Sequence, residues 1–383
     1  MNHRTPPRKS MQFPVVLPVA VAASVFGASG CRQQDREEPE PLQQANVATI
    51  AVASGDHILR TEAPLAVPDT TAGSDWLSIT TDLRYDIDLG VLFLMDMFNA
   101  SLVEIDTLGS LLNMYGGTKG RGPAEIGELA DFAFSPEWVL LLDRPNRKVM
   151  VYPRRKPMLD VFPLSSVYRS ITLREDGIIL LAPGADSSAV DLYTFAGERV
   201  GGIGRTEDLP VRCQSTDDCV REKRLCMGCK VREAGGVIYI HNEEDNMATV
   251  LDGAGGAELI DLQERIPQLG QWVLMDEPYM RAAQDAARER SPAGVVSVVF
   301  KRYLTNVHAL ADGRVAFSVN PARPIYSRTG YQYWLVDLET FNVETIMFTN
   351  PAQGRLATGW PTVYAVNRDD YGIYRLASGG NRR

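Results

Sequence analysis

The stretch GVLFLMDMFNASLVEID, residues 90–106, decides the fold because the chain repeats its pattern. It has an apolar run rich in large and β-branched side chains, then a polar tetrad, then a second run in which apolar and polar residues alternate. Two such runs on either side of a polar turn predict a β-hairpin. The same order recurs in EWVLLLDRPNRKVMVYP (137–153), GVIYIHNEEDNMATVLD (236–252) and PTVYAVNRDDYGIYRLA (361–377).

Each polar tetrad begins and ends with Asp or Asn, as in the one that runs from Asp96 to Asn99. These short side chains accept hydrogen bonds from backbone amides two residues on, and they tolerate left-handed backbone angles. We therefore interpret the first residue of each tetrad as a structural turn residue and assign it no catalytic role. The four residues are Asp96, Asp143, Asn242 and Asn367.

Two further stretches, which start at Asp176 and Asp312, repeat the pattern in a weaker form. The six hairpins then begin near residues 90, 137, 177, 236, 313 and 361, and their regular spacing of about 40 to 48 residues is typical of β-propeller blades. Strand candidates before most hairpins give three or four strands per unit. The sequence predicts an all-β fold, a six-bladed β-propeller over residues 53–378. Segment 57–67 is expected to close it by adding a strand to the last unit.

Two of the intervals between hairpins are longer and contain insertions. One holds four cysteines between residues 213 and 229. The other, DEPYMRAAQDAARERSP (276–292), has acidic residues and a proline at its start, followed by an Ala-rich run. That order predicts one short surface helix of about three or four turns. The last residues, 379–383, are expected to form a disordered tail.

Residues 1–30 have the features of a lipoprotein signal peptide. Three basic residues precede an apolar run that ends in small residues, and the segment contains no acid. Ala28-Ser29-Gly30-Cys31 resembles a bacterial lipobox, so Cys31 is predicted to carry the lipid and to begin the mature protein. Ordinary secretion with a coincidental cysteine is the alternative. Residues 31–52 are polar and contain proline, which predicts a flexible tether.

The other four cysteines, in CQSTDDCVREKRLCMGC, are interpreted through this export signal. Outside the cytosol a cluster of this kind is typical of disulfides. Three pairings are possible, and we favour nested bridges that close a polar flap. A zinc site and a thioredoxin-like redox motif are the alternatives, although only one half of the cluster has the spacing of a zinc knuckle. The expected bridges join Cys213 to Cys229 and Cys219 to Cys226.

The charge balance bears on the class of partner. The chain has 39 basic and 48 acidic residues, and removal of the three basic residues of the leader gives a net charge of −12. An acidic surface repels phosphate backbones, which argues against nucleic acid as a partner. It also argues against adhesion to anionic lipid by charge, so the predicted contact with a membrane is the lipid on Cys31.

The loop before the second hairpin contains the motif Gly120-Arg121-Gly122-Pro123-Ala124-Glu125-Ile126. Together with the strand and turn that follow, it resembles the bacterial six-bladed β-propeller lipoproteins related to NHL-repeat proteins. In those proteins a Gly-x-Gly-Pro-Gly-Glu-Phe-like motif precedes a blade, and Ala124 and Ile126 depart from it. The resemblance implies an exported propeller and no particular activity. Arg121 and Glu125 are candidate binding residues, which either face a central pocket or pair with each other.

Motifs of known catalytic chemistry are missing from the sequence. Outside the leader there are three histidines, none of them in a His-x-x-x-His or His-Glu-x-x-His set, and no Gly-x-Ser-x-Gly elbow occurs. His308 is the third candidate binding residue, because its presumed inner strand borders the channel. Either His241 or His308 could line the channel with carboxylates such as Asp176 or Asp312. A purely structural role is the alternative for His308 and for His241.

Because a fold does not decide function, two classes of function stay open. The first is a lipid-anchored binding or scaffolding module on the periplasmic or outer-membrane surface of a bacterial cell envelope. It would be a monomer without a cofactor, and its partner would be a peptide, a glycan or a protein. The alternative is a propeller enzyme, a metal-dependent lyase or a lactonase-like hydrolase, with a divalent cation at the axis. We assign no catalytic residue and no metal ligand.

Overall fold

The computed structural model divides the chain into two units, residues 1–51 and 52–383. All the residues that the structure describes belong to the second unit. They are 57–66, 80–96, 98–184, 188–210, 228–252, 256–290, 302–310, 313–320, 332–348, 356–359, 362–366 and 373–378. The predicted signal peptide, Cys31, the tether, the tail and Asn367 lie outside these ranges and remain predictions.

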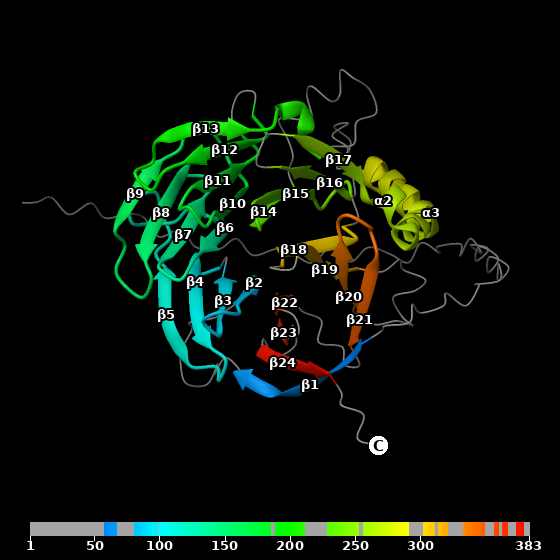
Figure 1. Ribbon diagram of the computed structural model, residues 1–383, viewed down its shortest axis with the longest axis horizontal. Coiled ribbons are helices and arrows are strands. Elements are labelled where there is room, and N and C mark those ends of the chain that lie inside the picture. The colour runs from blue at the N-terminus through cyan, green and yellow to red at the C-terminus, as the bar shows by residue number, and fades with distance from the viewer. Residues whose placement is uncertain are drawn as a thin grey trace, which may run out of the picture. The chain divides into compact units, whose positions relative to one another are not determined.

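The described strands form five β-sheets that follow one another around a centre (Figure 1). The fold is therefore an all-β propeller, as the hairpin repeat predicts. In each of four sheets, four antiparallel strands follow in chain order. The first sheet consists of β2 (Thr80–Asp86), β3 (Val91–Asp96), β4 (Ser101–Asp106) and β5 (Leu111–Gly116), and the second of β6 (Leu129–Phe134), β7 (Trp138–Asp143), β8 (Lys148–Pro153) and β9 (Asp160–Pro163). The third sheet consists of β10 (Ser170–Leu173), β11 (Ile179–Ala182), β12 (Val190–Tyr193) and β13 (Arg199–Ile203). The fourth consists of β14 (Cys229–Ala234), β15 (Val237–Asn242), β16 (Met247–Leu251) and β17 (Ala257–Asp261).

The fifth sheet has eight strands, so the prediction of six separate blades is wrong for the sheets that are described. Its strands lie in the order β18-β19-β20-β21-β1-β24-β23-β22. The strand that joins its two halves is β1, which pairs in parallel with β21 through His57–Leu59 and antiparallel with β24 as far as Ala66. The pairing with β24 confirms the predicted closing strand. The bounds are β1 (His57–Ala66), β18 (Leu304–Ala309), β19 (Arg314–Val319), β20 (Gln332–Asp337), β21 (Val343–Phe348), β22 (Leu356–Gly359), β23 (Thr362–Val366) and β24 (Ile373–Ser378).

Apolar side chains hold the sheets face to face because most strands are buried on both sides. On β3, Val91, Phe93 and Met95 pack against the second sheet, whereas Leu92 and Leu94 pack on the opposite face against Tyr364 of the fifth. Alternate residues of a strand point to opposite faces, so a run that is apolar at every position can serve two neighbours. This explains why the hairpin sequences are almost continuously apolar.

The turns between the second and third strands share one backbone feature. In three hairpins the residue directly after the tetrad has a positive φ, of 50° at Ala100, 47° at Arg147 and 53° at Asn246. The Asp at the start of the tetrad accepts backbone hydrogen bonds, as Asp96 Oδ1 does from Phe98 N (2.9 Å) and Asn99 N (3.1 Å). The left-handed position therefore lies one residue beyond the tetrad.

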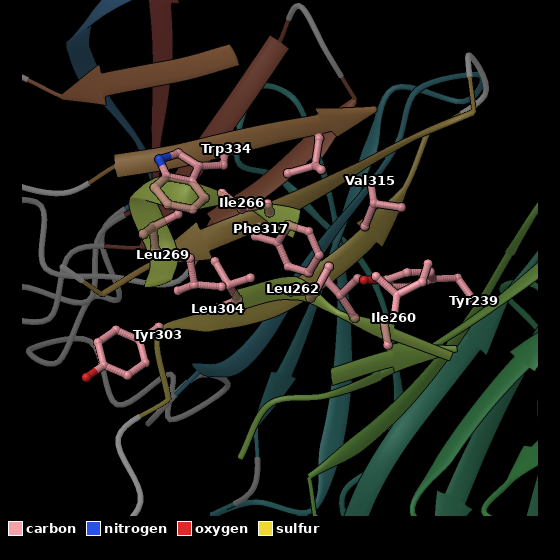
Figure 2. Packing of buried hydrophobic residues seen from close by; sticks show 14 of the residues in the cluster. Tyr239, Ile260, Leu262, Ile266, Leu269, Tyr303, Leu304, Val315, Phe317 and Trp334 are labelled. Atoms are coloured by element: carbon pink, nitrogen blue, oxygen red, sulfur yellow. The ribbon is translucent and has the colours of Figure 1, made fainter. Parts of the chain in front are cut away.

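The helical insertion is longer than the sequence predicts. After the short helix α2 (Leu262–Arg265), α3 runs from Pro267 to Arg290, 24 residues, instead of starting near residue 276. Proline is favourable at the first helical position, and the first two turns are held by tertiary packing. Leu269 and Trp272 are buried in the cluster between the fourth and fifth sheets. Figure 2 shows Leu269 among the side chains of this cluster. Among the described residues, no helix has the length and apolar character needed to cross a membrane.

Of the four clustered cysteines only Cys229 lies in the described part of the chain. It is the first residue of β14 and is buried in the core between the third and fourth sheets. Cys213, Cys219 and Cys226 lie outside the described residues, so the nested pairing stays a prediction.

Candidate axial binding site

The first strand of each four-stranded sheet and the two end strands of the eight-stranded sheet, β18 and β22, lie nearest the centre (Figure 1). These strands contact one another in order: β6 with β10, β10 with β14, β14 with β18, β18 with β22, and β22 with β2. They carry polar residues at alternate positions, which places these residues on one face of each strand. Asp82 and Arg84 share β2, and Ser170 and Thr172 share β10. The propeller therefore has a polar centre inside an apolar body.

A buried carboxylate, Asp131 on β6, joins four of these strands. It accepts hydrogen bonds from Arg84 Nη2 of β2, from Ser170 Oγ and Ile171 N (3.1 Å) of β10, and from Arg232 Nη1 (3.4 Å) of β14. Phe132 N (2.9 Å) donates to it as well. We call the group of Asp82, Arg84, Asp131, Ser170 and Arg232 the axial hub.

The hub controls the ionisation of this carboxylate. Burial alone would raise the pKa of Asp131, but the charges of Arg84, Lys230 and Arg232 and the hydrogen bond from Ser170 outweigh it and hold the pKa well below its ordinary value. A carboxylate with so many donors has little capacity left to accept a proton. Asp131 is therefore charged over the whole physiological range.

The two arginines of the hub differ in how fully they are paired. Arg84 donates to Asp82 through Nε (3.0 Å) and Nη2 (2.6 Å), to Asp131, and to Phe132 O, and its Cζ lies 3.9 Å from the centroid of the Phe132 ring. Burial lowers its pKa, but Asp131 and Asp82 more than compensate, so the pKa is raised. Arg84 is electrostatically satisfied by two carboxylates.

Arg232 is less well compensated. Its Nε donates to Val307 O (3.0 Å), and its Nη1 donates to Val231 O (2.6 Å) and lies 3.4 Å from Asp131. Burial first, and then repulsion from Arg84, lower the pKa of Arg232, and the two aspartates offset this only in part. In the described structure Nη2 of Arg232 has no hydrogen-bond partner.

A cavity of about 190 Å³ lies beside the hub, at the C-terminal ends of the innermost strands. Arg84, Arg232 and His308 line it together with Thr172 and Glu233. Every one of the five strands that line it contributes two consecutive residues, so its walls are rigid sheet. The remaining lining residues are Tyr85, Ala133, Phe134, Leu173 and Ala309.

Of the three candidate binding residues, the structure places His308 on this cavity and the other two elsewhere. Arg121 and Glu125 lie in the loop before β6, whereas the cavity lies at the other end of that strand. Glu125 Oε2 accepts from Gly122 N (2.8 Å), and Arg121 is exposed. Among the described residues no ion pair joins them, and neither lines the cavity.

The Gly-rich loop instead surrounds a lysine. Lys148 Nζ donates to the carbonyl oxygens of Gly122 (2.7 Å), Pro123 (2.9 Å) and Glu125 (2.5 Å). Asp143, the first residue of the tetrad, accepts from Gly127 N (3.0 Å) and lies 3.8 Å from the same ammonium. The motif therefore ties the loop to the hairpin turn.

The other polar residues considered from the sequence lie away from the cavity. His241 is fully buried, with Nε2 3.2 Å from Leu304 O, and burial lowers its pKa. Asp176 is paired with Arg174 (2.8 Å) at the surface, and Asp312 lies outside the described residues. Asn242 is in the β15–β16 turn, where its side chain donates to Asp245 (3.0 Å).

The carboxylates near the axis do not form a metal-binding group. Within the described ranges, no three His, Cys, Asp or Glu residues lie close enough together to hold a metal ion. Asp82 and Asp131 face arginines instead, and Glu233 accepts from Gly236 N (2.9 Å). The divalent-cation alternative thus has no ligand set among these residues.

No protein-family model and no curated protein matches the chain. Solved structures do. An exported protein from Bacteroides fragilis is 12% identical, with 83% of this chain and 94% of that chain covered and a TM-score of 0.48. Hydrazine synthase from Kuenenia stuttgartiensis is 11% identical (82% and 80% covered, TM-score 0.45). Virginiamycin B lyase from Staphylococcus aureus is 9% identical (77% and 94% covered, TM-score 0.44). At these values the neighbours carry no argument about activity.

Sequence reasoning missed the axial hub. Its signal was present in LADFAF, where the single charged residue Asp131 interrupts an otherwise apolar strand, and in CKVREA, which carries three charged residues in an inner strand. In a sheet with one solvent-exposed face, a charged residue of this kind points to solvent. Only the closed ring brings these positions together, so the pairing of Asp131 with Arg84 and Arg232 cannot be obtained from one hairpin at a time.

Proposed function

We propose that the protein is an exported β-propeller that is held at a bacterial cell envelope by a lipid on Cys31 and binds a peptide, glycan or protein partner at the axial cavity. The observation that carries the proposal is the cavity beside Arg84, Arg232 and His308. A pocket with a few convergent polar groups is the usual form of a ligand site.

Rigidity supports this assignment. The lining residues belong to innermost strands that the axial hub ties together, so their side chains are positioned before a partner arrives. A site on sheet strands, supported by hydrogen bonds from behind, loses little conformational freedom on binding. A group of the partner that enters the cavity would therefore meet a preformed surface.

The finer features of the predicted architecture belong to this proposal. We further propose that the four clustered cysteines form nested disulfides, as expected in an oxidising compartment. The burial of Cys229 at the start of β14 is compatible with such a staple.

We favour a binding module over an enzyme because of the state of Asp131. A general base or a metal ligand needs free lone pairs, whereas this carboxylate accepts five hydrogen bonds and is held ionised. Its role is to position the arginines. The metal-dependent lyase or lactonase therefore remains the less favoured alternative.

The experiment is affinity capture from solubilised bacterial envelope with a cavity-filling variant. Thr172→Leu adds bulk at a lining position whose side chain makes no hydrogen bond in the described structure. Arg121→Ala, in the exposed loop at the other end of β6, is the control. We expect a molecule identified by mass spectrometry to be captured by the wild type and by the control and lost by Thr172→Leu. Equal capture by all three would reject the axial cavity as the binding site.

A separate measurement tests the anchor. Mass spectrometry of the protein extracted from membranes should find the mature chain starting at Cys31 with acyl chains attached. A mature N-terminus at any other residue, or Cys31 without acyl chains, would reject the anchor and leave the cavity proposal standing.

A further inference from the structure

We infer that the group bound in the axial cavity is a carboxylate, held by Nη2 of Arg232. The inference rests on the proposed function, since it names the chemistry of the ligand at that same site. It starts from Nη2 of Arg232, a guanidinium nitrogen that has no acceptor among the described residues and belongs to a side chain that lines the cavity.

The geometry leaves one edge of the Arg232 guanidinium for a ligand. Arg232 is only 7% exposed, and its Nε and Nη1 are committed to Val307 O, Val231 O and the hub. Nη2 has no partner in the described structure, and the residue lines the cavity. A guanidinium donor that has no protein acceptor and belongs to a residue of the cavity lining is a position where an acceptor group of a ligand is expected to bind.

The local charges ask for an anion at this position. Arg84 and Arg232 lie side by side, and burial together with repulsion from Arg84 disfavours the charged form of Arg232. The two aspartates are already engaged on the side of the hub. A negative group on the cavity side would stabilise the charged form of Arg232 and so offset the effect of burial. An opposite charge nearby favours the ionised form of a titratable group.

The amount of charge favours a carboxylate over a phosphate. Among the residues that line the cavity, Arg84 and Arg232 carry positive charge and Glu233 carries negative charge. One additional negative charge balances this lining, whereas a dianion would bring a second charge without a counterpart. Arginine donors serve carboxylates and phosphates alike, so the choice between the two rests on this charge.

The rest of the cavity suits a compact organic body behind the carboxylate. Phe134, Leu173 and Ala309 supply apolar surface, and Thr172 and His308 supply polar groups beside it. The volume of about 190 Å³ is below the usual range for drug-sized ligands, which begins at about 300 Å³. The cavity therefore fits a small organic acid or the carboxylate end of a larger molecule.

The test is calorimetric titration of the mature protein with propanoate, with D-glucuronate as a larger carboxylate. Propanamide, D-glucose and inorganic phosphate are the comparison probes. Arg232→Lys keeps the positive charge beside Asp131 but removes Nη2, and Thr172→Leu fills the cavity without touching the hub. Arg121→Lys makes the same chemical change on the exposed loop. Thermal unfolding of each variant checks that it is folded.

We expect propanoate to bind the wild type and Arg121→Lys with equal affinity. Its affinity for Arg232→Lys should be lower by about tenfold or more, and Thr172→Leu should not bind it. Glucuronate binding should follow the same order if the natural ligand is a sugar acid, whereas binding of propanoate alone indicates a smaller acid. Propanamide and phosphate should bind more weakly than propanoate by at least the same factor. If Arg232→Lys does not fold, Thr172→Leu and the neutral probes still decide the result.

Several outcomes would overturn the inference, and they separate it from the proposed function. If phosphate or propanamide binds as tightly as propanoate, or if no carboxylate binds, the assignment of a carboxylate as the bound group is wrong. If D-glucose binds the wild type and loses binding in Thr172→Leu, the cavity is still a binding site and only the anion is wrong. If propanoate binding survives in Thr172→Leu, the anion binds elsewhere, and the axial site fails with it.

Discussion

Asp131 of β6 and Arg232 of β14 are 101 positions apart in the chain, and Oδ2 of the one lies 3.4 Å from Nη1 of the other. The same carboxylate also contacts Arg84 of β2 and Ser170 of β10. One buried side chain thus connects the innermost strands of four sheets. The hub positions the arginines of the cavity, and it also holds the ring of sheets together at its centre.

Asp131→Asn should destabilise the fold strongly. The amide keeps the size of the side chain but removes the charge, which leaves Arg84 and Arg232 buried beside each other with only Asp82 opposite. Removing one member of a buried ionic network costs about 3 to 5 kcal/mol. Urea denaturation measures the free energy of unfolding. Asp88→Asn, in the exposed turn between β2 and β3, is the control and should change it by less than about 0.5 kcal/mol. A small effect of Asp131→Asn would mean that the hub does not stabilise the ring.

The contribution of Asp131 should also depend on pH with a definite sign. Its pKa in the folded protein is lower than the ordinary 3.8, so the unfolded chain takes up the proton first as the pH falls. The stabilisation that the ionised Asp131 provides is therefore complete above the ordinary pKa. It is lost as the pH falls towards the pKa of Asp131 in the folded protein. We expect the difference in unfolding free energy between the wild type and Asp131→Asn to be constant between about pH 7 and 5 and to shrink below about pH 4. A difference that grows on acidification would contradict this sign.

Lys148→Met should disorder the Gly-rich loop. The ammonium of Lys148 satisfies three carbonyl oxygens and lies beside Asp143, and methionine keeps the apolar stem without the charge. Leaving buried polar groups unpaired costs about 1 to 3 kcal/mol each, and we expect a total loss of about 3 kcal/mol. Hydrogen exchange should show faster exchange at residues 117–127.

Lys156→Met, at an exposed position after β8, is the matched control and should leave both stability and exchange unchanged. If Lys148→Met leaves the loop as protected as in the wild type, the lysine does not organise the motif.

Trp272→Ala tests the early start of α3. Trp272 is fully buried, and its ring centroid lies 4.9 Å from that of Trp334 on β20. Truncation of a large buried aromatic residue costs about 3 to 5 kcal/mol. Leu274→Ala, two residues on and 69% exposed, should cost less than about 0.5 kcal/mol. Equal effects at the two positions would show that the first turns of the helix are not docked as described.

The hairpins could be predicted from the sequence because their signals are local. In the stretch from Val91 to Asp106, apolar runs and an Asp-to-Asn tetrad specify strand, turn and strand without help from the rest of the chain. The closing strand β1 could be predicted because an open ring leaves an edge unpaired. The number of sheets could not be predicted, because β1 pairs with β21 on one side and with β24 on the other and so joins two neighbouring units into one sheet.

The start of α3 and the axial hub could not be predicted because their causes are distant in the chain. The first turns of α3 contain Pro267 and Gly270, and it is the burial of Leu269 and Trp272 between two sheets that stabilises them. In the sequence, Asp131 and Arg232 of the hub look like ordinary solvent-facing residues of their strands. Of the two candidate residues in the Gly-rich loop, Glu125 accepts a hydrogen bond from Lys148 through its backbone carbonyl oxygen, and Arg121 is exposed.

The most direct test of the account is a crystal structure of the mature protein with saturating propanoate. The account predicts electron density for the carboxylate in the axial cavity, within hydrogen-bond distance of Arg232 Nη2, in the wild type and in Arg121→Lys but not in Thr172→Leu. Propanoate bound only outside the cavity, with water alone beside Arg232, would contradict the central claim that the axis is the binding site.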